Sequence, residues 1–546
     1  MTKEILHVSS RCGGGKSRET IRELVDHIKG KQPCEETYLF ASKTNELTGQ
    51  NLKMFVEFTQ QQTGLTIPVK RIDSETHKGS VIRDLSELLI TGFNGVIFIS
   101  HSTLATIQPS LLKNTRVVID EVPQELAGCL TVRHAAKDHG YPWEKYLINT
   151  ASNHDGYMRT RLNPNADEDD IRRYISNLRG GIDNVTTTNV ADLLEFLLAD
   201  YEVVYTTTTN SDGTLNCLYQ AIHYHRLHEL SRNVDFLAIL SAQLKDTLFG
   251  FVAEKHLKLK IVNKPINSSS AANLPMRHKN KVRIIPFLQK GRWSTTLKMK
   301  TANECLYKNG QPVTSPIPVW MLAQEMTEFI LGKEDFLITL NTKEKLLDSL
   351  DRDGVERTSL AVHGMNSYRK LHHAAYLASS NPTPFDIKAL LMFAKDHGLD
   401  GQELIDTVIA ERCHEAAYQC VARTSIRNHK HDPNKEHIII VPDMQYANYV
   451  AKWFENGCAK IDTQFSYTTL YEEAQKAAEE SRRMIIIHII SEKMKRKEKL
   501  KSIIDKSGIS RSTYKRYKEE FRAELENLGL IPPKRSSAKT DTKTAA

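Results

Sequence analysis

A glycine-rich segment close to the start of the chain, residues 10–17 (SerArgCysGlyGlyGlyLysSer), restricts the possible folds most strongly. It follows an apolar run at 4–8 that predicts a short buried strand, and it precedes a helical pattern at 18–27. Small residues let backbone N–H groups close around a phosphate, while a Lys and a hydroxyl reach its oxygens and Mg²⁺. The residues that would supply these groups are Gly13, Gly14, Gly15, Lys16 and Ser17. The pattern GxxxxGK[ST] is met except at its first position, where Ser10 replaces Gly; the alternative is a Gly-rich turn with a chance GlyLysSer.

A second segment, residues 117–124 (ValValIleAspGluValProGln), ends an apolar run in two carboxylates. Asp120 would hold the water shell of a metal ion together with Ser17, and Glu121 would orient and deprotonate an attacking water. Alone, such a pair often marks a strand end that meets solvent. About 100 residues after a phosphate-binding loop, it predicts the hydrolytic half of the same site.

Predicted strands alternate with predicted helices along most of the chain. Strands are expected at 4–8, 37–41, 95–100, 116–120, 202–206 and 235–240, then at 282–287, 336–340, 359–362, 375–378 and 436–441. Helices are expected at 18–27, 81–89 and 190–198, then at 342–350, 385–397 and 402–423. The alternation indicates mostly parallel sheets with helices on both faces. We expect two α/β lobes, 1–266 and 267–490, with a polar linker at 267–273 and an insertion at about 141–189.

The order of these segments resembles that of superfamily 2 helicases, the DExD/H-box-like nucleic-acid motors. Residues 38–50 are similar to that family's strand and PTxxLxxQ segment, and 96–104 to its next backbone-contacting element. The resemblance implies nucleic-acid contacts from Ser42, Lys43, Thr44, Ser102 and Thr103. Residues 240–244 resemble the SAT motif that couples hydrolysis to movement, with Ser241 and Ala242 in place and Gln243 instead of Thr.

The second predicted lobe continues the resemblance. Residues 336–344 are similar to the strand and helix that begin this lobe, and 362–366 to the His-Gly that follows. Gln419, Arg423 and Arg427 match QxxxRxxxR, which that family uses to place arginines against the γ-phosphate from across a cleft. Their spacing predicts one helix face, the alternative being a solvated basic face. The resemblance implies tandem RecA-like P-loop lobes that bind ATP and Mg²⁺.

The basic charge is concentrated at the end of the chain. Residues 491–546 hold 16 Lys and Arg against 8 Asp and Glu, whereas the rest of the chain is balanced. Within it, 499–517 resembles a helix-turn-helix in which Gly508 makes the turn and Ser510 caps the second helix. The residues that would meet DNA are Arg511, Ser512, Thr513, Lys515 and Arg516. The alternatives are an ordinary helical hairpin and a solvated basic tail.

Composition excludes other classes of protein. The longest apolar runs, 438–441 and 484–490, are too short to span a membrane. Eight cysteines without a CxxC pair disfavour a zinc ribbon or a disulfide framework and fit the cytoplasm of a bacterium or an infected host.

We therefore expect an ATP-dependent helicase or translocase of the phage or plasmid type that acts in replication or recombination, and its layout resembles that of an origin-binding helicase. Because the basic excess lies in the helix-turn-helix-like segment, DNA is favoured over RNA as its partner, with replication proteins as further partners. The alternatives are a DNA-dependent ATPase that remodels protein–DNA complexes without unwinding, a packaging motor, and a transcription regulator. A packaging motor needs an acidic C-terminal nuclease, which the sequence lacks, and a regulator has no need of a two-lobe ATP site.

Overall fold

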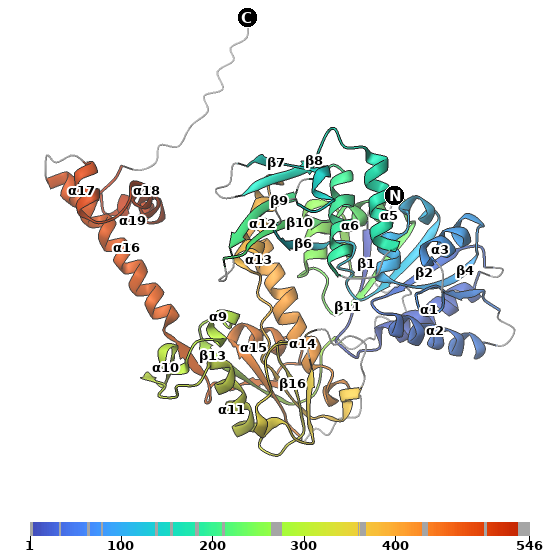
Figure 1. Ribbon diagram of the computed structural model, residues 1–546. Helices are drawn as coiled ribbons and strands as arrows, with labels where there is room; N and C mark the ends of the chain where they lie inside the picture. The colour runs from blue at the N-terminus through green and yellow to red at the C-terminus, as the bar shows by residue number, and fades with distance from the viewer. Residues whose placement is uncertain are drawn as a thin grey trace, which may run out of the picture. The chain divides into compact units, whose positions relative to one another are not determined.

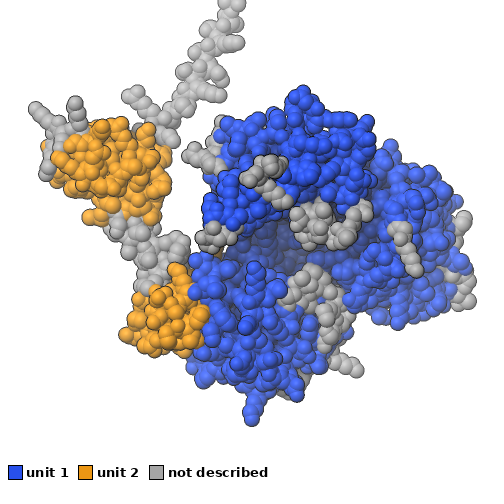
Figure 2. All heavy atoms as spheres, viewed as in Figure 1, with its two compact units in different colours: residues 1–287, 293–299, 320–465 blue, residues 288–292, 300–319, 466–546 orange. Residues whose placement is uncertain are grey.

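The computed structural model describes residues 4–31, 34–62, 66–77, 80–136, 140–152, 157–180, 185–201, 203–209, 213–263, 276–358, 360, 367–428, 435–495 and 500–532. The chain forms two compact units: residues 1–287, 293–299 and 320–465, and residues 288–292, 300–319 and 466–546 (Figure 2). The expected linker at 267–273 and the 362–366 segment lie outside the described residues. Within the described part, no helix combines the length and apolar character that a membrane span requires.

The first lobe of unit 1 is built on a seven-stranded, fully parallel sheet (Figure 1). Its strands, in spatial order, are β12 (Lys260–Val262), β1 (Glu4–Ser9), β11 (Phe236–Ser241), β5 (Thr115–Asp120), β2 (Thr37–Ser42), β4 (Gly95–Ser100) and β3 (Val69–Arg71). Its helices are α1 (Lys16–Lys29), α2 (Asn45–Gln60), α3 (Val81–Ile90), α4 (His101–Thr106), α7 (His225–Asn233) and α8 (Leu248–Phe251). The parallel α/β lobe predicted from the alternation is confirmed.

Successive residues of the central strands enter two different cores, because side chains alternate across a sheet. Phe40 and Phe98 pack with α1 and α2 through residues such as Ile21 and Phe55. Their neighbours Leu39 and Ile97 pack on the opposite face, in the cluster that contains Leu85 of α3 and Leu227 of α7. Helices therefore cover both faces of the sheet, and the carboxyl ends of the parallel strands share one edge.

A five-stranded antiparallel sheet interrupts this lobe between β5 and β11. Its order is β6 (Gly128–Ala135), β10 (Leu215–His223), β9 (Val203–Thr209), β8 (Met158–Leu162) and β7 (Leu147–Ala151). Helices α5 (Glu168–Gly180) and α6 (Val185–Leu198) accompany it around a core of their own. The expected strand at 202–206 belongs here and not to the parallel sheet, and the 141–189 segment lies within this larger insertion of 128–223.

The second lobe of unit 1 is also α/β. It contains β13 (Val282–Lys290, whose end from Leu288 belongs to unit 2), β19 (His437–Asp443), β18 (His373–Tyr376), β16 (Phe336–Thr339), β17 (Val355–Thr358) and β20 (Ala459–Ile461). The pairs β13–β20, β16–β17, β16–β18 and β18–β19 are parallel. The helices are α9 (Thr295–Lys298), α11 (Val319–Leu331), α12 (Pro384–Asp396), α13 (Gly401–Ile409), α14 (Ala416–Val421) and α15 (Met444–Ala451).

The prediction of a helix at 342–350 is wrong, since only a 3₁₀ turn, Asp348–Leu350, forms there. Side chains occupy the backbone groups that a helix would use. Gln324 donates to the Lys345 carbonyl at 3.0 Å and accepts from the Leu347 N–H at 3.0 Å. The amide of Asn341 pairs with the backbone of Ser379 in both directions. These contacts hold the segment as an irregular connection between β16 and β17.

The expected continuous helix at 402–423 is also divided. A π-helical stretch, Ala410–Glu415, joins α13 to α14, and α14 ends at Val421. Thr424 is extended and the Ser425 N–H donates to the Leu371 carbonyl, so Arg427 lies in a separate 3₁₀ turn, Ser425–Arg427. The prediction that Gln419, Arg423 and Arg427 share one α-helical face is therefore wrong.

Unit 2 combines a small sheet with a helical end. The last residues of β13 pair with β21 (Tyr467–Thr469), which pairs with β14 (Leu306–Lys308), followed by β15 (Gln311–Pro312) and preceded by α10 (Ala302–Cys305). Helix α16 (Leu470–Lys495) leads to α17 (Leu500–Lys506), α18 (Arg511–Glu520) and α19 (Arg522–Asn527). Their core includes Ile486 and Ile489 of α16, so the helical cluster begins before residue 491.

Candidate functional site

The glycine-rich loop forms a tight turn between β1 and α1. Gly13 and Gly15 have φ of 71° and 86°, in the left-handed region that favours glycine. The Gly14 N–H donates to the Arg11 carbonyl at 3.0 Å, and a Cβ at Gly14 would collide with the Ser10 hydroxyl. The Ser10 hydroxyl therefore has room in the loop because residue 14 is a glycine. Among the described residues, nothing lies within 4 Å of a Cβ built on Gly15, so the loop is open on that side.

Lys16 and Ser17 begin α1 and point to different partners. The Lys16 Nζ donates to the carbonyls of Ser10 and Arg11 at 3.0 and 3.3 Å, so its ammonium lies against the loop. The Ser17 Oγ donates to Asp120 Oδ1 at 2.9 Å. The two predicted metal-binding residues, which are 103 positions apart in sequence, are thus in direct contact.

Asp120 is buried at the end of β5 and has a second donor that the sequence interpretation missed. Asn51 on α2 donates to Asp120 Oδ2 and to Ser42 Oγ, each at 3.0 Å. Burial and the neighbouring Glu121 raise the pKa of Asp120, against the opposing effect of the hydrogen bonds from Asn51 and Ser17. A buried carboxylate with a raised pKa and a serine hydroxyl beside it is a suitable place for a hard cation, which would stabilise the charged form.

Glu121 adopts a strained backbone conformation. Its φ is 75°, in the left-handed region where a side chain costs of the order of 1 kcal/mol. Its N–H donates to the Leu240 carbonyl of β11 at 2.9 Å, which holds the residue in place. Behind it, a ring nitrogen of buried His101 lies 2.9 Å from the Asp120 carbonyl oxygen. His101 and Asn51 are polar residues buried by tertiary packing, and no local pattern signals them.

Residues of the second lobe contact the loop directly. The Cys12 N–H donates to the Tyr418 hydroxyl at 2.9 Å. Arg11 Nη1 lies 2.9 Å from His278 Nδ1, and His278 Nε2 lies 3.0 Å from the Tyr418 hydroxyl. Because arginine can only donate, Nδ1 must accept and Nε2 carries the proton. Burial lowers the pKa of His278 to about 3, which keeps it neutral.

The two predicted arginines also reach the loop. A Cβ built on Gly13 would lie 3.0 Å from Arg427 Cγ, so the Arg427 side chain lies directly on the glycine loop. Arg423 is buried, and its pKa is lowered by burial and by Arg427, while the charge of Glu121 acts in the opposite direction. Two arginines of the second lobe therefore reach this region, Arg427 at the glycine loop and Arg423 within the electrostatic range of Glu121.

The third residue of that pattern, Gln419, is bonded elsewhere. Gln419 Nε2 donates to Glu415 Oε1 at 3.1 Å, and the Tyr449 hydroxyl donates to Glu415 Oε2 at 2.7 Å. Burial raises the pKa of Glu415 to about 7, in spite of these two hydrogen bonds and of the charges on Lys452 and Lys16. Glu415 is thus a buried acid that takes up or releases its proton near neutral pH.

We expect Glu415 to make the second lobe less stable as pH rises. The folded state holds this proton more tightly than the unfolded state, so the free energy of unfolding falls between about pH 4.5 and 7 and is constant above. The shift corresponds to at most about 3 kcal/mol. Glu415→Gln should remove this dependence, because an amide is neutral throughout and still accepts from Gln419.

The measurement is the thermal unfolding midpoint between about pH 5 and 8. Glu403→Gln, at an exposed position of α13, is the matched control and should behave like the unaltered chain. A midpoint for Glu415→Gln that falls with pH as steeply as in the unaltered chain would contradict the assignment.

The candidate coupling segment lies at the end of β11. A ring nitrogen of His7 lies 2.9 Å from the Ser241 Oγ, and the Ser9 Oγ donates to the Ala242 carbonyl at 3.2 Å. Burial lowers the pKa of His7 to about 4, so this contact is formed by a neutral ring. Gln243 donates to Asp246. The segment is therefore tied to β1, the strand that carries the glycine loop.

The candidate nucleic-acid contacts of this lobe differ in exposure. Ser42 is completely buried beside Asn51, and Thr103 is buried beside Ser100. Ser102 is exposed, and Lys43 and Thr44 are partly exposed, with Thr44 capping α2 by accepting from the Leu47 N–H. Only these last three residues are placed to touch a large ligand, whereas Ser42 and Thr103 support the site from within.

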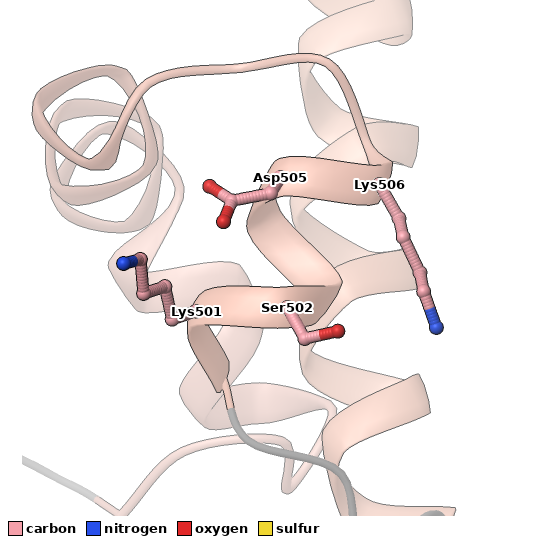
Figure 3. Close-up of a pocket in the computed structure, with 4 residues that line it drawn as sticks. All are labelled: Lys501, Ser502, Asp505 and Lys506. Carbon is pink, nitrogen blue, oxygen red and sulfur yellow. The ribbon is translucent and has the colours of Figure 1, made fainter.

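The basic C-terminal helices have the local geometry expected from their sequence. Gly508 has a φ of 70°, and Ser510 caps α18 by accepting from the Thr513 N–H at 3.1 Å. The exposed residues of α18 include Arg511, Ser512, Lys515 and Arg516, with Thr513 partly exposed. Lys501, Ser502, Asp505 and Lys506 of α17 line a shallow pocket, in which Lys501 and Lys506 project to different sides (Figure 3). Two short helices thus present cations to solvent in unit 2.

No protein-family model and no curated protein sequence matches this chain. Among solved structures, it is similar to Mss116p bound to single-stranded RNA and AMP-PNP, with 10% identity and a TM-score of 0.32 over 97% of this chain and 86% of that chain. The DUF1998 helicase MrfA bound to DNA and AMPPNP gives 11% identity and 0.31 over 84% and 50%. T4 UvsW gives 10% and 0.21 over 84% and 74%. At such identities and TM-scores, the activity of this chain has to be inferred from its own residues.

Proposed function

We propose that the protein hydrolyses ATP between its two α/β lobes and uses the cycle to translocate on nucleic acid and unwind it. The observation that supports this most strongly is the contact of Arg427, from the second lobe, with Gly13 of the phosphate-binding loop. A site that needs cations from two lobes is complete only when they are together, which links hydrolysis to relative motion of the lobes.

The residues of the first lobe suit the binding of a nucleoside triphosphate. The N–H groups of residues 13–17 would donate hydrogen bonds to phosphate oxygens at the start of α1. Lys16 would release its two carbonyl partners and bind the phosphate oxygens instead. Ser17 and Asp120 would hold Mg²⁺, which when bound neutralises charge on the phosphates. Glu121, held by the hydrogen bond from its N–H to the Leu240 carbonyl, would orient the attacking water and accept its proton.

The second lobe would complete the site. Arg423 and Arg427 would stabilise negative charge that spreads over the transferred phosphoryl group, since Arg427 lies on the loop and Arg423 is influenced by the charge of Glu121. Gln419 would act indirectly, by holding Glu415 in place together with Tyr449. The hydrogen bond from the Glu121 N–H to the Leu240 carbonyl would transmit a movement of Glu121 to the segment that follows, which contains Ser241, Ala242 and Gln243.

Nucleic acid would be held by two separate surfaces. Lys43, Thr44 and Ser102 would contact the backbone at the first lobe. The α17–α18 pair would bind DNA as a helix-turn-helix, with Arg511, Lys515 and Arg516 reaching phosphates or base edges. The helix-turn-helix-like form of this basic end supports DNA as the partner over RNA, and with it a role in replication or recombination.

The test of this proposal is ATP hydrolysis with no nucleic acid, single-stranded DNA, duplex DNA and RNA, together with strand displacement on the same material. We expect stimulation by DNA and displacement of a labelled strand. Stimulation by duplex without displacement would favour the alternative, an ATPase that remodels protein–DNA complexes. Absence of hydrolysis under every condition would contradict both functions.

Removing cations from α18 should weaken DNA binding without affecting the ATP site. In Arg511→Ala/Lys515→Ala/Arg516→Ala, the slope of log K against log salt should fall by about 2 to 3, because each lost phosphate contact releases about one counterion fewer. Basal hydrolysis should be unchanged. The matched control removes three exposed lysines of the first lobe, Lys255, Lys258 and Lys260.

The measurement is DNA affinity as a function of salt concentration. An unchanged slope in the α18 variant, or an equal loss in the lysine control, would show that α18 is an ordinary helical surface.

A further inference from the structure

A cluster of three potential metal ligands lies in the antiparallel sheet of the first lobe. Single ligand atoms of His134, Glu144 and Cys217 all lie within 4.8 Å of one another. His134 on β6 and Cys217 on β10 are directly paired across the two strands, and Glu144 is in the short 3₁₀ turn Glu144–Tyr146 that follows β6. The cluster is independent of the nucleotide site, and cross-strand pairing is what brings its members together.

The unprotonated ring nitrogen of His134, Nε2, faces the carboxylate of Glu144. His134 Nδ1 lies 3.1 Å from the Ala135 carbonyl, which can only accept, so Nδ1 carries the proton. In the neutral ring, Nε2 then presents a lone pair. It lies 3.2 Å from Glu144 Oε1 and makes no hydrogen bond within the described residues, although the side chain is only 5% exposed. Two lone pairs that face each other at this distance require either a proton or a metal ion between them.

The other two ligands are positioned in a similar way. The Tyr141 N–H donates to Glu144 Oε2 at 2.7 Å, which leaves Oε1 directed at His134. Cys217 is a buried free cysteine, and its Sγ lies 3.4 Å from the Tyr205 hydroxyl. Three aromatic rings surround His134, from Tyr141, Trp143 and Tyr219, with ring centroids at 4.6, 5.3 and 5.9 Å. Such an apolar shell strengthens electrostatic attraction between a cation and its ligands.

We propose that His134, Glu144 and Cys217 bind a divalent transition-metal ion of the zinc class. Imidazole, thiolate and carboxylate are the ligands that Zn²⁺ prefers, and tetrahedral coordination separates nitrogen and sulfur ligands by about 3.5 Å. The observed Nε2–Oε1 separation of 3.2 Å fits tetrahedral coordination, and because all three ligand atoms lie within 4.8 Å of one another, a side-chain adjustment of at most about 1.5 Å brings Cys217 Sγ to bonding distance. Binding converts the thiol to a thiolate and releases its proton to water; a water molecule takes the fourth position, on the side where Glu144 is partly exposed.

The bound ion would fasten the turn after β6 to two strands of the insertion. Glu144 is the only one of the three ligands that lies outside the sheet, so a metal bond to it restrains the chain that leads to β7. The site is therefore assigned a structural role in the insertion, separate from ATP hydrolysis.

The test uses the full chain without an affinity tag, loaded with Co²⁺ alone. We expect one tightly bound Co²⁺ per chain and a near-ultraviolet thiolate-to-cobalt charge-transfer band that Zn²⁺ abolishes. Cys217→Ser should lose this band. Cys129→Ser is the matched control, because Cys129 lies on β6 but on its other face, and it should keep the band. Glu144→Gln, at a partly exposed position, should keep the band and lower Co²⁺ affinity by at least about 10-fold.

Either of two results would overturn the proposal. One is a chain that shows no thiolate band with Co²⁺, which would mean that His134 and Glu144 form only a hydrogen-bonded ion pair. The other is a band that persists in Cys217→Ser. If Cys217→Ser does not fold, judged by its circular dichroism, Glu144→Gln decides instead: unchanged Co²⁺ affinity in that variant contradicts the site.

Discussion

Lys16→Ala is expected to lose ATP hydrolysis by at least about 10²-fold while DNA binding by the chain is retained. The Lys16 ammonium is the cation of the first lobe that lies against the glycine loop, where its two carbonyl partners hold it ready for phosphate oxygens. DNA contacts are assigned to other residues of the first lobe and to α18, so they should survive. The measurements are steady-state hydrolysis and DNA affinity on the same preparation.

Lys29→Ala is the control for this variant, since Lys29 lies on the same helix and its Nζ donates to Gln62 at the surface. It should hydrolyse ATP as the unaltered chain does. If Lys16→Ala kept most of its hydrolysis, the loop would be a glycine-rich turn with another role.

Arg427→Ala is expected to lower kcat by about 10³-fold or more, with a much smaller effect on nucleotide affinity. A guanidinium that stabilises the transferred phosphoryl group acts mainly in the transition state, whereas the loop and Lys16 bind the ground state. Arg427→Lys should recover part of the rate, because a lysine keeps the charge but loses the planar fork. The measurements are kcat and equilibrium binding of a non-hydrolysable nucleotide.

Arg357→Ala, at an exposed position on β17 of the same lobe, is the matched control. An equal fall in kcat and in nucleotide affinity for Arg427→Ala would mean that the residue only supports the loop through Gly13. In that case the proposed role of the second lobe in catalysis would be wrong.

The sequence predicts the parallel sheets because their determinants are local. Runs such as 96–99 and 117–119 are apolar on every residue, as strands buried on both faces must be, and turn residues bound them. The antiparallel insertion was not predicted, because β6 and β10 are paired across a separation of about 80 residues. In sequence, β7 is followed directly by β8 and β9 by β10, with α5 and α6 between the two pairs, and only the 202–206 strand of this sheet was expected.

The candidate site could be predicted only where one short segment supplies the functional residues and also determines how they are arranged. The glycine loop with Lys16 and Ser17 is such a segment. Asn51, His101, His278 and Tyr418 have no such signal, because single polar residues are buried there by contacts between distant elements. The arginine spacing was misinterpreted as one helix face because the π-helical stretch and the extended Thr424 depend on packing and not on propensity.

The hydrogen bond from the Cys12 N–H to the Tyr418 hydroxyl makes the shape of the glycine loop a property of both lobes. By thermodynamic reciprocity, any ligand that holds the loop more firmly in this shape must increase the affinity of the lobes for each other by the same factor. Loss of that ligand must weaken their association equally. Under the proposed function, release of the product and separation of the lobes are therefore thermodynamically coupled. A force that pulls the lobes apart is expected to weaken nucleotide binding.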